Sequence, residues 1–130
     1  MIEHPRAEEL LEAVARWIDD LRPALAARDA FLARVAVNAL QTVRRELVQG
    51  PAAEAAAVER FSALLGITGD YDTLNAELCA RLRAGALDVD APGLLPALRA
   101  TVAAQIAIDQ PKYTPDGAAR TLQAAIAKPA

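Results

Sequence analysis

Residues 29–49 read DAFLARVAVNALQTVRRELVQ, and the predicted architecture of the 130-residue chain depends on this segment. A helix advances about 100° per residue, which places its apolar side chains on one broad arc and leaves a narrow polar strip opposite. Gly50 and Pro51 follow, and a glycine C-cap before a residue without an amide proton is typical of a helix end. We expect a central helix over about residues 28–49, with a buried arc of Leu32, Val35, Ala36, Ala39, Leu40, Val43 and Leu47. On this pattern a charge at Val43 should unfold the domain.

Further segments with helical periodicity lie on both sides of the central one. Their apolar residues recur at three- and four-residue steps, as Leu74, Leu78 and Leu82 do. Gly66 and Gly85 stand where C-caps are expected. Three predicted helices cover residues 5–21, 52–65 and 93–109. A fourth is capped by Asp72 or Thr73 and ends at Gly85, and a last one begins with Thr114, Pro115 and Asp116.

The composition indicates an all-α protein. Hydrophobic residues make up 54% of the chain but aromatic residues only 4%, and alanine dominates the hydrophobic fraction. Alanine favours closely packed helices, whereas sheets are rich in β-branched and aromatic residues. A chain of this length suits one domain. We therefore expect a single helical domain, residues 1–130, folded as a compact bundle of five or six helices around the long central helix.

The charge and cysteine content exclude several classes of function. The formal net charge is -3 and the pI is about 5.1, so the chain has no general attraction for nucleic acid or for an anionic membrane surface. No uncharged run approaches the length of a membrane span. The single Cys79 cannot form an internal disulfide, and the acidic N-terminal segment does not resemble a signal peptide. A cytoplasmic protein without nucleic-acid or membrane partners is expected.

The sequence supplies few residues for catalysis or metal binding. With one His and one Cys, a structural zinc site, a Cys-His pair and a Ser-His-Asp triad are poorly supported. Asp70 and Asp72 are spaced like the start of a calcium loop, but Arg81 occupies the position of the bidentate glutamate. No glycine-rich phosphate loop occurs. We expect no catalytic residue, no metal and no cofactor, and we lean against an enzyme.

One polar cluster lies on the predicted central helix. Arg34, Asn38, Gln41 and Arg45 fall within a narrow sector, and we call these four residues the polar seam. One interpretation is structural, because a central helix uses such residues to face solvent or to bind the carbonyls of neighbouring loops. The other is functional, because two guanidiniums on one helix face can bind a carboxylate, a phosphate or an acidic partner, with Tyr113 from the late loop nearby.

Several motifs along the chain resemble those of a known protein family. They are HPRAEELLEAVARW at residues 4–17, the Ala30-Phe31 to Leu47 portion of the central segment, LNAELCARLRAG at residues 74–85 and QPKY at residues 110–113. The family is an uncharacterised bacterial all-helical domain family that accompanies aminoglycoside-phosphotransferase-like kinases and acyl-CoA dehydrogenases. Its members tend to have Asn-Pro before the late Tyr, where this chain has Gln110-Pro111.

The leading functional hypothesis is a non-catalytic helical accessory or interaction module. The resemblance implies a phosphotransferase-like kinase or an acyl-CoA dehydrogenase as partner, and an Ala- and Leu-rich helix face would also suit a homo-oligomer. The alternative is a protein or enzyme that binds a small anionic ligand in a pocket lined by Arg34, Asn38 and Arg45.

Overall fold

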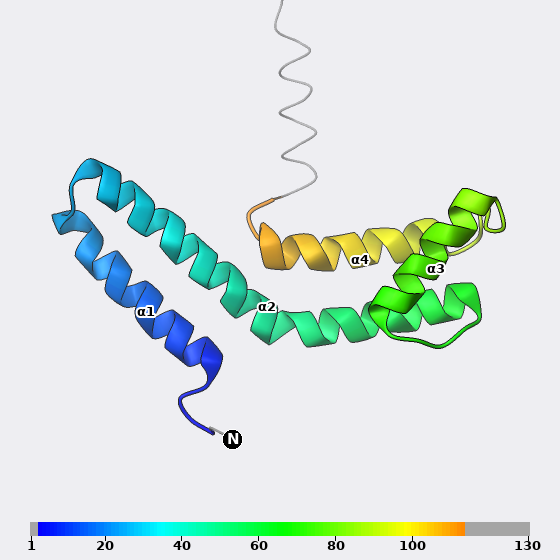
Figure 1. Cartoon of the computed structure of the whole chain (residues 1–130), viewed down its shortest axis with the longest axis horizontal. Coiled ribbons are helices and arrows are strands. Elements are labelled where there is room, and N and C mark those ends of the chain that lie inside the picture. Colours follow the sequence, from blue (N-terminus) through cyan, green and yellow to red (C-terminus); the bar gives the residue numbers. More distant parts are fainter. Residues whose placement is uncertain (1–2, 114–130) are drawn as a thin grey trace, which may run out of the picture.

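Four α-helices and one short 3-10 helix make up the computed structural model, which describes residues 3–113 (Figure 1). The expected all-α class is confirmed, and residues 3–113 contain no strand. The expected count of five or six helices is not matched, and the last predicted helix, after Thr114, lies outside the described residues. The elements are α1 (Ala7–Leu21), η1 (Arg22–Ala24), α2 (Ala27–Leu65), α3 (Tyr71–Ala84) and α4 (Leu94–Asp109).

Helix α2 does not end at Gly50, so the predicted break there is wrong. It runs unbroken for 39 residues with Pro51 in its interior. Proline normally keeps the preceding residue out of the helical region, because its ring clashes with that residue's Cβ, and Gly50 has no Cβ. Alanine and glutamate, both strong helix formers, fill residues 52–57 and favour continuation. Pro51 still lacks an amide proton, and α2 bends near its middle, as proline-containing helices do (Figure 1).

The helices form two groups along α2 instead of one compact bundle. Helix α1 lies antiparallel to the first half of α2 and forms a hairpin with it, while α3 and α4 pack against α2 further along (Figure 1). Helix α1 contacts neither α3 nor α4. The molecule is therefore elongated, with α2 as the element common to both groups.

The buried core lies in the group formed by α3, α4 and the second half of α2. The predicted stripe of Leu74, Leu78 and Leu82 is confirmed as a packing surface. The aromatic ring of Phe61 stacks on that of Tyr71 with 6.0 Å between centroids. Arg81 donates a hydrogen bond of 2.9 Å to the carbonyl oxygen of Leu65 and so ties α3 to the end of α2. The core cluster consists of Phe61, Leu65, Leu74, Leu78, Leu94 and Ala97.

The apolar arc predicted for the first half of α2 is largely exposed, which corrects the expectation that this half forms the core. Val43 is 50% exposed and Leu32 is 51% exposed. The physical reason is that this half of α2 has α1 as its main neighbour, and one helix covers only a limited part of another's circumference. Val37 lies in the covered part and is buried. A charge at Val43 is consequently not expected to unfold the protein.

The N-cap of helix α3 lies two or three residues earlier than predicted. The N-cap is Asp70, whose Oδ1 accepts a hydrogen bond of 2.8 Å from the amide of Thr73, instead of Asp72 or Thr73. The predicted glycine caps are confirmed, since Gly66 and Gly85 follow α2 and α3 with φ of 69° and 71°. Left-handed backbone at these positions favours glycine.

The core cluster predicts where large-to-small substitutions are costly. Phe61→Ala should lower the free energy of unfolding by about 3–5 kcal/mol, because it removes a buried ring and leaves a cavity. Val89→Ala should change it by less than about 0.5 kcal/mol, since Val89 is 75% exposed. Urea unfolding followed by circular dichroism measures both. Equal losses would contradict the assignment of the core to this group.

The cap of α3 predicts a specific acid dependence. Hydrogen bonding from the Thr73 side chain, and then from its amide, lowers the pKa of Asp70 below its ordinary value. The stabilisation from the charged cap is therefore fully present above the unfolded-state pKa and is lost as the pH falls through the lower folded-state pKa. Asp70→Asn keeps a neutral cap, so urea unfolding should show a smaller loss of stability on acidification than the wild type does. Asp90→Asn, in a loop, should behave as the wild type; an identical acid response in all three proteins would contradict the prediction.

Candidate interaction face

Small and branched apolar side chains hold the α1–α2 hairpin together. Ala15 is buried on α1 and Val37 on α2, and both face the partner helix. At the open end of the hairpin, the guanidinium of Arg44 lies 2.9 Å from a carboxylate oxygen of Glu12. These contacts occupy one side of each helix and leave a second apolar stripe on each without a covering element among residues 3–113.

The two uncovered stripes form what we call the hairpin face. Every large member is at least 42% exposed, and Trp17, at 62%, is the most exposed of them. Burying such side chains is worth roughly 1.5–3 kcal/mol each, so leaving a whole row in water is costly. The hairpin face consists of Leu10, Val14, Trp17 and Leu21 from α1 and Leu32, Val35, Val43 and Leu47 from α2.

Helical geometry places both stripes on the same side of the hairpin. On α1 the exposed stripe is rotated by roughly 110° from the residues that contact α2, and on α2 the corresponding rotation has the same size and sense. In antiparallel helices, equal rotations of the same sense point to the same side of the pair. The stripes are therefore continuous across the hairpin and form one apolar surface.

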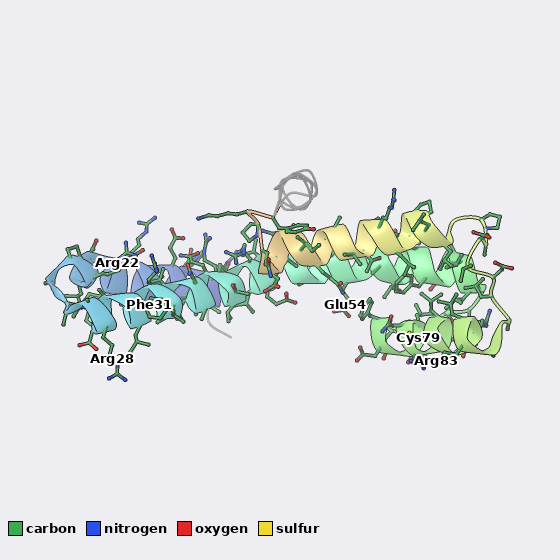
Figure 2. All side chains as sticks on the ribbon, turned by 90° about the horizontal axis from the view of Figure 1, so that it is seen from above. Arg22, Arg28, Phe31, Glu54, Cys79 and Arg83 are labelled. Atoms are coloured by element: carbon green, nitrogen blue, oxygen red, sulfur yellow. The ribbon has the colours of Figure 1, made fainter. Side chains whose placement is uncertain are left out.

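The opposite side of each helix in the hairpin is polar. Helix α1 carries Glu12, Arg16 and Asp20 there, and Arg16 binds Glu12 at 2.6 Å. The polar seam of α2 lies on this side as well. Figure 2 shows the hairpin end, with Arg22, Arg28 and Phe31, at the far end of the molecule from Cys79 and Arg83. An amphipathic hairpin at one end of an elongated molecule results.

The structure gives the members of the polar seam different surroundings. The guanidinium carbon of Arg34 lies 5.6 Å from the ring centroid of Phe31, and the carbonyl of Asn38 accepts a hydrogen bond from the Thr42 hydroxyl. Asn38 is exposed and Gln41 is half-buried. Tyr113, on the loop after α4, is 45% exposed.

Arg45 ties the first half of α2 to the end of α4. Its Nε donates a hydrogen bond of 2.5 Å to the carbonyl oxygen of Ile108, and its second amino group donates one of 3.0 Å to the Thr42 hydroxyl. The Ile108 carbonyl lies in the last turn of α4, where carbonyls lack helical partners. Arg45 therefore supplies a charged hydrogen bond to a helix end, the structural role that one interpretation of the seam gives it.

A groove of about 340 Å³ lies between α2 and α4, apart from the polar seam. Glu46, Glu54 and Asp109 bring carboxylates to it, and the Gln105 amide donates a hydrogen bond of 3.1 Å to the Tyr71 hydroxyl at its wall. Sequence reasoning missed this groove, because it exists only where α4 returns along α2. None of Arg34, Asn38, Gln41, Arg45 and Tyr113 lines it.

Other chemical groups are dispersed over the described part of the chain. Residues 3–113 contain no cluster of three His, Cys, Asp or Glu side chains with metal-binding geometry. His4 is paired with Glu9 at 3.3 Å near the start of α1, and hydrogen bonding from the Arg6 amide, then from His4, lowers the pKa of Glu9. Cys79 is partly buried in α3. No helix within residues 3–113 has the length and hydropathy required to cross a bilayer.

Within residues 3–113, the fold and the hairpin face define an all-helical protein with a large apolar surface that no described element covers. A family model matches residues 23–113, and its description is a domain of unknown function, DUF6285. The chain belongs to this family. No curated protein and no solved structure matches the chain. The matched region begins in η1 and extends through α4, so the family pattern includes α2 but not α1.

The bond between Arg45 and Ile108 predicts a stability difference within the polar seam. Arg45→Met should lower the free energy of unfolding by about 1.5–3 kcal/mol, because a charged hydrogen bond is lost and a helix-end carbonyl is left without its partner. Arg34→Met, at an exposed position, should cost less than about 1 kcal/mol, the typical value of an exposed cation–π contact. Urea unfolding compares the two variants. Equal effects would show that Arg45 does not tie α4 to α2.

Proposed function

We propose that the protein is a non-catalytic protein–protein interaction module that works in the cytoplasm through its hairpin face. The observation that carries the proposal is the exposure of eight large apolar side chains on one side of the hairpin. Soluble proteins rarely leave an apolar surface of this extent exposed unless another molecule covers it. Trp17 near the middle of the α1 stripe is the residue type most enriched among binding hot spots.

The contacts of the polar seam favour this function over binding of a small anion. A ligand pocket would need Arg34, Asn38 and Arg45 to converge on a concavity. Arg45 instead donates to Ile108, and Arg34 lies over Phe31 at an exposed position. The groove between α2 and α4 is rimmed by carboxylates, which would repel an anion.

The resemblance noted in the sequence motifs implies two classes of partner for such a module. One is a phosphotransferase-like kinase and the other an acyl-CoA dehydrogenase. Either would use the module as an accessory subunit that contributes the hairpin face as a binding surface.

The hairpin face predicts that a charge placed within it abolishes assembly without unfolding the protein. Val43→Asp should keep the helical circular dichroism spectrum of the wild type, because Val43 is 50% exposed, and should lose every complex that the face makes. The measurement combines sedimentation of the purified protein with co-purification of co-expressed kinase-like and dehydrogenase-like candidates.

Val102→Asp is the matched control, because Val102 is 47% exposed on α4 and lies outside the hairpin. It should keep both the fold and every complex. If Val43→Asp and the wild type assemble identically with themselves and with each candidate, the hairpin face is not an interaction surface.

A further inference from the structure

We propose that the hairpin face is covered by the hairpin face of a second copy of this chain, so that two hairpins form an antiparallel four-helix bundle with two-fold symmetry. This inference rests on the proposed interaction function and names the partner. The spacing of the exposed stripes, the size of the face and the distribution of charge between the two helices support a second copy as the partner.

The stripes have the spacing that helical bundles use. On α1 the exposed residues Leu10, Val14, Trp17 and Leu21 follow each other at steps of four, three and four residues. On α2 the corresponding steps lead from Leu32 through Ala36 and Ala39 to Val43. Such heptad-like steps allow side chains to interdigitate with a second helix pair. Each helix thus has one apolar stripe that contacts its partner in the hairpin and a second apolar stripe that can contact a helix of another hairpin, as in a four-helix bundle.

The size of the hairpin face suits a stable dimer. Helix α1 has 15 residues and so is about 22 Å long, and two adjacent helices are about 20 Å wide. One face therefore projects an area of about 450 Å², and the accessible surface of its protruding side chains is larger. Two such faces together approach or exceed the roughly 1,000 Å² expected of a biological interface. The face is also free of charge at its centre, as homodimer interfaces tend to be.

The net charges of the two helices favour one orientation of the second copy. Helix α1 carries five acidic residues and one Arg, a net charge of -4, whereas residues 27–49 of α2 carry four Arg and two acidic residues, a net charge of +2. Most of these charges lie on the polar side of the hairpin, so they act through the net charge of each helix. Placing α1 of each copy over α2 of the other puts a helix of net charge -4 beside one of net charge +2. Placing α1 over α1 would bring two acidic helices together.

This pairing determines the position of the two-fold axis. Only an axis parallel to the helices places α1 of one copy over α2 of the other. All neighbouring helices are then antiparallel, and the two η1 turns lie at the same end of the bundle. An axis perpendicular to the helices, within the interface, would place α1 over α1 and the turns at opposite ends.

The experiment uses the purified full-length chain. Sedimentation should show a dimer for the wild type and for Val102→Asp, whereas Val43→Asp should raise the dimer dissociation constant about 100-fold or more with an unchanged circular dichroism spectrum. Trp17→Ser, at a 62% exposed position, should weaken the dimer in the same direction and gives a second test if Val43→Asp does not fold.

The orientation is measured with a spin label at Ala24 in η1, in a Cys79→Ala background. Electron–electron distance measurements should give a separation below about 25 Å, because the two turns lie at one end of a bundle with helices 8–10 Å apart. A separation above about 30 Å would place the turns at opposite ends and overturn the proposed pairing.

The failure of this inference differs from the failure of the proposed function. A monomeric wild type that still retains a co-expressed partner, with that partner lost in Val43→Asp, would overturn the second copy as occupant but keep the interaction function. A dimer that survives both Val43→Asp and Trp17→Ser would place the interface elsewhere and overturn the inference. A monomeric wild type that retains no candidate would overturn both.

Discussion

The structure depends on the continuity of α2 across Gly50 and Pro51. Helix α1 contacts the first half of α2, and the buried core is built on the second half, so the two groups are related to each other mainly through one helical backbone. A proline in a helix interior removes a hydrogen bond and costs free energy. Gly50 removes the clash that would otherwise end the helix, and the alanines after Pro51 favour its continuation. These local residue preferences produce the long bent helix.

The two halves of α2 are buried to different extents, and this explains why one end of the molecule has a core and the other an exposed apolar face. The second half of α2 meets α3 and α4, and Phe61 and Leu65 are almost fully buried there. The first half packs mainly against α1, and a two-helix hairpin buries only the side chains between its two helices. Its remaining apolar side chains have nothing to cover them within residues 3–113. The same apolar pattern therefore forms a core in one half of the helix and an exposed surface in the other.

Much of the fold could be predicted from the sequence, and the errors have physical causes. Periodicity and glycine caps predicted α3, α4 and the end of α2, because these signals are local. Periodicity shows which side of a helix is apolar, but not whether another helix covers it, so Val43 and Leu47 were wrongly assigned to the core. Gly50-Pro51 was interpreted as a helix end because glycine followed by proline usually ends a helix. That interpretation overlooked that glycine, which lacks a Cβ, can keep helical backbone before a proline.

The candidate sites were less predictable because they depend on contacts between distant segments. Arg34, Asn38, Gln41 and Arg45 were grouped correctly on one side of α2, but the partner of Arg45 is the carbonyl of Ile108, 63 residues away. The groove between α2 and α4 arises from the same long-range packing. No local sequence pattern predicts either of these contacts.

The position of the Arg45 hydrogen bond gives it a mechanical role. Arg45 precedes Pro51 in α2, while α4 packs along α2 and ends at the carbonyl that Arg45 binds. A rotation at the proline would move Arg45 relative to α4 and lengthen this bond. The hydrogen bond from Arg45 to Ile108 therefore restrains the angle between the hairpin and the core. The same bond adjoins the α2–α4 groove, because Ile108 and Thr42, the two residues that Arg45 binds, both line it.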